Sequence, residues 1–209
     1  MPRATRSKKD QMLMIWPERV WIYSPVRVMF LRLHAERWLK LAGVDQAQHV
    51  LEIGCGLGRG ARILVDKMGF KNVVAFDLEE SLIRGAVKKL PSRLESKISF
   101  FVGDAQSLPF GDSVFDAVVN FGIIHHVLDW RKCIREIGRV MRHGGIFYFE
   151  EIYPPLYANF LLKRMLRHPR EDRFDGPLFL ESLDSSKLRL LDGVRTDSRF
   201  GIIGAARKE

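Results

Sequence analysis

The sequence predicts an α/β protein with a doubly wound sheet, and two observations indicate it. Short apolar runs alternate with helical patterns between residues 50 and 150, as expected for parallel strands joined by helices. The first run, at 50–53, has no helical period and leads into glycines at alternate positions and then into a helical pattern. With 209 residues, the chain is long enough for a single domain with a sizeable core.

The remaining elements follow from the same patterns. Strands are expected at 50–53, 72–76, 98–102, 114–120 and 146–150, and helices at 60–68, 81–89, 130–141 and 178–191. Two short strands at 194–200 and 201–207 are expected to form a closing antiparallel hairpin, which gives seven strands. Residues 152–177 are expected to be helix followed by loop, with a basic stretch at 163–173.

The chain before the first strand has a different composition. Residues 1–10 form a basic tail that is expected to be disordered, and residues 11–43 are helical in pattern and rich in aromatic side chains. Pro17 and Pro25 divide this region, and Ser24-Pro25 is typical of a helix start. We therefore divide the chain into an N-terminal segment, 1–43, and a main domain, 44–209. Two roles remain open for the segment, a lid over the site or a helix that covers the sheet.

Composition narrows the class of protein. No apolar run reaches about 18 residues, and no secretory signal is recognisable, so a cytoplasmic protein is expected. Cys55 and Cys133 have no metal-ligand spacing and are expected to be reduced thiols. The net charge is +9, with nine Lys/Arg against four Asp/Glu in residues 1–50. This excess suits an anionic membrane surface, a nucleic acid or an acidic substrate, and equally a solvated basic surface.

The glycine turn indicates a nucleotide-type ligand. Gly54, Gly56 and Gly58 follow the first strand, and Glu52 stands two residues before them. Glycine permits a sharp turn and lets a ligand lie against the backbone. A dinucleotide fingerprint would need its third glycine at position 59, where the chain has arginine. Asp77 ends the second strand, 23 residues after Gly54, where a carboxylate can accept hydrogen bonds from a ribose diol.

Further polar residues come at the ends of the next strands. Asp104 and Ala105 follow the third strand, Asn120 ends the fourth, and His125-His126 come directly after it. In an open parallel sheet these ends lie at the ligand-binding edge. Four features therefore occur in order over about 75 residues: Glu52 with the glycines, Asp77, the Asp104-Ala105 pair, and the stretch 120–126. Their joint spacing indicates a ligand site more strongly than any one of them alone.

Together these motifs resemble the class I S-adenosylmethionine (SAM) dependent methyltransferases, in particular the type-11 subgroup of quinone and small-molecule enzymes. The resemblance is specific over residues 50–150, and His143 replaces the usual proline before the paired glycines. It implies a Rossmann-like sheet, SAM as cofactor and a small acceptor, and the apolar N-terminal segment favours a lipophilic acceptor. The implied cofactor contacts are Glu52, Gly54, Gly56, Gly58, Asp77, Leu78, Asp104, Ala105 and Asn120.

Methyl transfer from a sulfonium needs alignment first, and a general base only when the acceptor must lose a proton. His125 and His126 are the expected base candidates, with Tyr23 and Glu151 as others, but the histidines could equally shape the pocket. No metal site is expected. Two alternatives remain open: a SAM-binding module without turnover, and a dinucleotide-dependent oxidoreductase. Nucleic acid is a disfavoured substrate because Asn120-Phe121-Gly122-Ile123 lacks the motif for methylating base amino groups.

Overall fold

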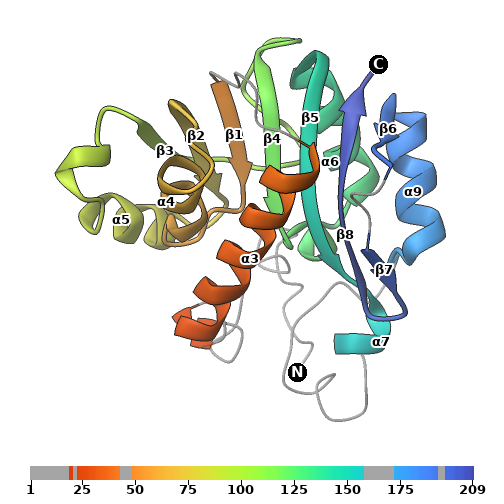
Figure 1. The fold of residues 1–209 in the computed structure, drawn as a ribbon, viewed down its shortest axis with the longest axis horizontal. Helices are drawn as coiled ribbons and strands as arrows, with labels where there is room; N and C mark the ends of the chain where they lie inside the picture. Colours follow the sequence, from red (N-terminus) through yellow and green to blue (C-terminus); the bar gives the residue numbers. More distant parts are fainter. Residues whose placement is uncertain (1–18, 21–22, 43–48, 158–171, 193–195) are drawn as a thin grey trace, which may run out of the picture.

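The computed structural model describes residues 19–20, 23–42, 49–157, 172–192 and 196–209. In these parts of the chain an eight-stranded sheet has the strand order β3-β2-β1-β4-β5-β8-β6, with the short β7 beside β8 (Figure 1). The first five strands are parallel, and β8 is antiparallel to its neighbours. The predicted α/β class, the mostly parallel sheet and the closing hairpin are confirmed.

The strands are β1 (His49–Ile53), β2 (Asn72–Asp77), β3 (Ile98–Val102), β4 (Phe115–Phe121), β5 (Met141–Ile152), β6 (Leu188–Leu190), β7 (Thr196–Ser198) and β8 (Gly201–Lys208). The first four lie within one or two residues of their expected positions. Strand β5 begins earlier than the expected residue 146, because Met141 already pairs with Phe115 across a register irregularity. Val50, Leu51 and Ile53 are fully buried, as a central parallel strand requires.

The predicted helix at 178–191 was wrong in its second half. Helix α9 (Gly176–Ser185) is followed by strand β6. This strand, which the sequence pattern did not predict, raises the number of strands from the predicted seven to eight. Asp175 caps the helix by accepting a hydrogen bond from the Leu178 amide, at 3.1 Å. The backbone then turns at Lys187, whose φ is +59°, so the helix cannot continue. Leu188, which fits a helical period, is buried as a strand residue paired with β8.

Helices cover both faces of the sheet. Helices α3 (Pro25–Ala42), α4 (Arg59–Asp66) and α5 (Glu80–Lys88) share one apolar core, and α6 (Trp130–Val140) and α9 share the other. The short elements are η1 (Ser92–Leu94), η2 (Ile124–His126) and α7 (Pro154–Tyr157). Figure 1 shows α3 crossing the sheet in front of the central strands. Strands β1, β2, β3 and β4 are parallel, so their carboxyl ends, where the predicted site residues stand, meet at one edge of the sheet.

Helix α3 covers a sheet face, which was one of the two roles considered for the N-terminal segment. Trp38 is fully buried, with its ring 5.3 Å from Phe121 and 5.6 Å from Tyr148, measured between centroids. Ser24 caps the helix by accepting a hydrogen bond from the Arg27 amide at 3.1 Å. The expected tail and the first helical residues, 1–18, and the basic stretch at 163–170 lie outside the described residues. The lid role and the division at residue 43 stay predictions.

Candidate cofactor and active site

The glycine turn has the left-handed backbone conformation that its glycines predicted. Gly54 and Gly56 have φ values of +67° and +54°, which side-chain-bearing residues rarely adopt. A Cβ at Gly54 would collide with the Ile123 side chain, whereas one at Gly56 would meet nothing within 4 Å. The turn therefore packs tightly on one side and leaves open space beside Gly56, as a cradle for a ligand would.

Asp77 joins the end of β2 to this turn. Its carboxylate accepts hydrogen bonds from the amides of Gly56 and Glu79, both at 2.9 Å, and the residue is 7% exposed. Burial raises the pKa of Asp77, and the two amides oppose that rise. Each carboxylate oxygen keeps further lone-pair capacity, so a diol could still be bound. The position suits the predicted ribose acceptor, and that role stays a prediction.

Glu52 lies beneath the turn as a buried carboxyl. Its Oε1 occupies the place where a Cβ on Gly60 would be, which explains the glycine at that position. Its Oε2 is buried and has no hydrogen-bond partner among the described residues. Burial raises the pKa of Glu52 to about 8, and the nearby charge of Asp77 adds to the rise. A buried acceptor without a partner fits a ligand that brings a cationic donor to the glycine turn.

The remaining predicted cofactor residues lie at the same edge. Asp104 accepts hydrogen bonds from the Gln106 amide at 2.8 Å and from its side chain at 3.1 Å. Ala105 is buried, and Leu78 is half-buried. Gly103, which precedes Asp104, donates its amide to the Asp77 carbonyl at 3.0 Å, so the two predicted loops are joined.

Asn120 is fully buried, and its amide is engaged within the protein. Its Nδ2 donates to the Glu150 carbonyl at 3.1 Å and to Glu151 Oε1 at 2.7 Å, while its Oδ1 accepts from the Ile123 amide at 3.0 Å. The side chain thus ties β4 to β5 and shapes the loop after β4. Its predicted contact with the cofactor stays a prediction.

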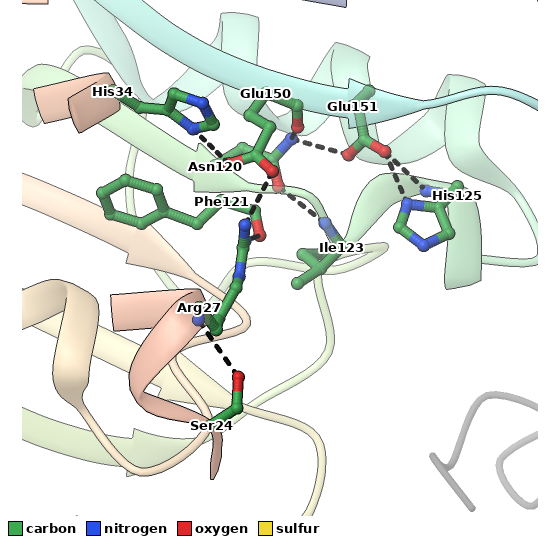
Figure 2. A network of polar contacts seen from close by, with 9 residues as sticks. All are labelled: Ser24, Arg27, His34, Asn120, Phe121, Ile123, His125, Glu150 and Glu151. Carbon is green, nitrogen blue, oxygen red and sulfur yellow. Dashed lines mark hydrogen bonds and ion pairs between the residues drawn. The ribbon is translucent and has the colours of Figure 1, made fainter. Parts of the chain in front are cut away.

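His125 is held by a fully buried glutamate (Figure 2). The Nδ1 atom lies 2.7 Å from Glu151 Oε2, and Glu151 also accepts from the Ile124 amide at 2.7 Å. The His126 ring lies 4.3 Å from that of His125. Glu151, a base candidate from the sequence, thus contacts His125, and which of the two is a base stays a prediction. Tyr23, the other candidate, is half-buried, and its carbonyl accepts a hydrogen bond from Arg59 at 2.9 Å.

A second buried pair, which sequence reasoning missed, clamps α3 to the sheet. Arg27 donates to Glu150 Oε1 and to the Phe121 carbonyl, both at 2.7 Å, and His34 Nδ1 lies 2.8 Å from Glu150 Oε2 (Figure 2). Arg27 and Glu150 are 123 residues apart, so no local sequence signal could have paired them. Glu150 and Glu151 point to opposite faces of β5, one toward α3 and the other toward His125.

Comparison with known proteins decides the family. A family model described as a methyltransferase domain matches residues 51–149, the stretch that holds the glycine turn, Asp77 and both histidines. Residues 51–149 of this chain therefore form a domain of the class I SAM-dependent methyltransferase family. SAM is accordingly the cofactor of this methyltransferase domain, and the unpartnered Glu52 oxygen and the open space beside Gly56 fit it.

Relatives of the domain include mycobacterial proteins. A probable S-adenosylmethionine-dependent methyltransferase of Mycolicibacterium smegmatis is 31% identical over 118 residues, which are 56% of this chain and 43% of that protein. A phthiotriol/phenolphthiotriol dimycocerosates methyltransferase of Mycobacterium tuberculosis is 35% identical over 107 residues, 51% of this chain and 38% of that protein. The chain thus matches less than half the length of these two relatives.

Solved structures share the fold. The [4+2]-cyclase SpnF superposes with a TM-score of 0.69 at 21% identity, covering 85% of this chain and 80% of the cyclase. The PH0226 protein of Pyrococcus horikoshii superposes with a TM-score of 0.68 at 25% identity, covering 93% and 97%. Among the described residues, no helix is long and apolar enough to cross a membrane, and no group of three potential metal ligands is present.

Proposed function

We propose that the chain transfers the methyl group of SAM to a small, lipophilic acceptor that gives up a proton. The observation that carries this proposal is the His125–Glu151 pair, which lies beyond the end of β4, the strand next to the one that leads into the glycine turn. The apolar helix α3 beside that edge supports a lipophilic acceptor. A relative named as a dimycocerosate methyltransferase adds support for this acceptor class.

The chain supplies binding and alignment. Bound SAM supplies a methyl group already activated for displacement. Glu52 and the glycine turn would hold its amino acid part, Asp77 its ribose, and Leu78, Asp104 and Ala105 its adenine. Holding donor and acceptor in line while excluding water accounts for most of the expected rate gain.

His125 would receive the acceptor proton at Nε2. An ionised carboxylate only accepts hydrogen bonds, so Glu151 fixes the proton of His125 on Nδ1 and leaves Nε2 as the basic atom. Asn120 and the Ile124 amide hold Glu151 in turn. Glu151 is therefore a positioning residue, and His125 is the proposed base.

The function is tested by incubating the chain with methyl-tritiated SAM and a bacterial lipid extract, with an aqueous extract in parallel. We expect label in the organic phase together with S-adenosylhomocysteine. Measured SAM binding without labelled product or S-adenosylhomocysteine in any extract would instead favour the binding module without turnover.

Replacing His125 with alanine should lower kcat about 100-fold while SAM affinity changes less than about twofold, because a general base contributes to the chemical step alone. Glu151→Gln should lower kcat by about tenfold or more and change the pH profile, because the amide no longer fixes the Nδ1 proton. His126→Ala is the matched control and should retain more activity than His125→Ala. An unchanged kcat in His125→Ala would remove the base role and leave methyl transfer itself intact.

SAM binding should release a proton near pH 6.5. Glu52, whose pKa burial raises to about 8, is mostly protonated at that pH, and a cationic donor beside it favours the ionised form. The affinity should therefore rise with pH up to about 8. Calorimetry in buffers of different ionisation enthalpy measures the released proton. Glu52→Gln should abolish the release, and proton release that persists in that variant would contradict the assignment.

A further inference from the structure

The outer face of α3 is apolar where a helix on a water-exposed surface would ordinarily be polar. Its inner face buries Leu31, Ala35 and Trp38 against the sheet. On the opposite side four large apolar side chains are between 38% and 52% exposed: Val26, Met29, Phe30 and Leu33. Their i, i+3, i+4, i+7 spacing puts them in one row, which we call the outer stripe. A helix that is apolar on both sides indicates a second apolar environment.

A cationic groove adjoins the outer stripe. It has a volume of about 420 Å³ and is lined by Pro25, Val28, Met29, Arg32 and Arg59. Arg32 is exposed on α3, while Arg59 begins α4 and donates to the carbonyls of Tyr23 and Ser24, at 2.9 and 3.3 Å. The groove thus combines apolar walls with two guanidinium-bearing side chains, a combination that suits an anionic headgroup with an attached acyl chain.

The charge and position of α3 indicate what kind of partner would cover the outer stripe. Helix α3 holds four Lys/Arg residues against the single acid Glu36, and one of the four, Arg27, is already paired with Glu150. The outer stripe occupies the first turns of α3, the end that Arg27 ties to the Phe121 carbonyl at the carboxyl end of β4. The apolar row therefore lies next to the edge of the sheet that carries the cofactor residues.

We propose that the outer stripe and the cationic groove dock the protein on an anionic lipid surface. Apolar side chains of an interfacial helix enter the boundary between headgroups and acyl chains, and basic side chains contact lipid phosphates. A bilayer is favoured over a protein partner because cations flank the apolar row and the adjoining groove adds two guanidinium-bearing side chains. Docking would bring the site edge to lipophilic acceptors, but it requires no turnover, so it stands independently of the proposed function.

Vesicle flotation of the 209-residue chain tests this proposal. We expect binding to vesicles of phosphatidylcholine and phosphatidylglycerol in equal parts, and weaker binding to phosphatidylcholine alone. Replacing three residues of the outer stripe, V26S/M29S/L33S, should lower the partition coefficient at least tenfold, because less apolar surface enters the lipid. Arg32→Gln should lower it about fivefold on the anionic vesicles only, since each basic residue near such a surface contributes about 1 kcal/mol.

The matched control is V87S/L178S, which removes two exposed apolar side chains from α5 and α9, at 56% and 37% exposure. This variant should bind vesicles like the unaltered chain, and circular dichroism should show that all variants are folded. If the unaltered chain does not bind vesicles, the proposal is wrong. It is also wrong if the control variant loses as much vesicle binding as the triple variant. Unchanged vesicle binding by the triple variant would also overturn it. So would a chain that does not bind vesicles but forms a concentration-dependent dimer, if the triple substitution abolishes that dimer.

Discussion

Replacing Asp77 with alanine is expected to weaken SAM binding at least about 100-fold. The Asp77 carboxylate is buried, and we propose that it accepts two ribose hydroxyls. Hydrogen bonds to a charged group are each worth about 1.5–3 kcal/mol. The same change frees the amides of Gly56 and Glu79, so the glycine turn also loses an internal tie. Isothermal titration calorimetry with SAM and with S-adenosylhomocysteine measures the loss.

Two variants separate these contributions. Asp77→Asn keeps the shape and an acceptor oxygen but removes the charge, so its affinity should fall between those of the unaltered chain and Asp77→Ala. Val87→Ser, an exposed change on α5, should bind SAM normally. Unaltered affinity in Asp77→Ala would mean that the ribose contact has been assigned to the wrong residue, while the family membership would stand.

Replacing Arg27 with methionine is expected to lower the free energy of unfolding by about 3–5 kcal/mol. Glu150 is 9% exposed, and without Arg27 its carboxylate would remain buried with a lost ionic partner. Urea denaturation followed by circular dichroism measures the change. Arg84→Ala is the control, because its pair with Glu80 is largely exposed and should be worth less than about 0.5 kcal/mol.

The pH dependence of stability provides a second test of this clamp. Burial alone would raise the pKa of Glu150, but the hydrogen bond from His34 and the charge of Arg27 lower it to about 2. Since the folded pKa is below the unfolded value, the stabilisation is fully present above about pH 4.5 and is lost as pH falls toward 2. Arg27→Met should flatten this acid limb. If the variant loses unfolding free energy equally steeply at acid pH, that loss comes from other carboxylates.

Much of the fold follows from local pattern. The parallel strands at 49–53, 72–77, 98–102 and 115–121 are apolar runs separated by helical periods, and each of them is found close to its predicted place. Strand β6 was missed because Leu188 and its neighbours satisfy a helical period equally well. Only pairing with β8 and the turn at Lys187 select the extended form.

The sequence by itself determined that the predicted cofactor residues of the first half of the sheet lie close together. Glu52, the glycines and Asp77 lie within one strand–turn–helix–strand unit, where spacing along the chain largely dictates spacing in the fold. The tertiary structure decided which partners the polar residues of β5 contact. Glu151 contacts His125 across 26 residues, and Glu150 contacts Arg27 across 123, because β4 and β5 are neighbours and α3 crosses them. Such pairings depend on which strands lie side by side, and no local pattern encodes that.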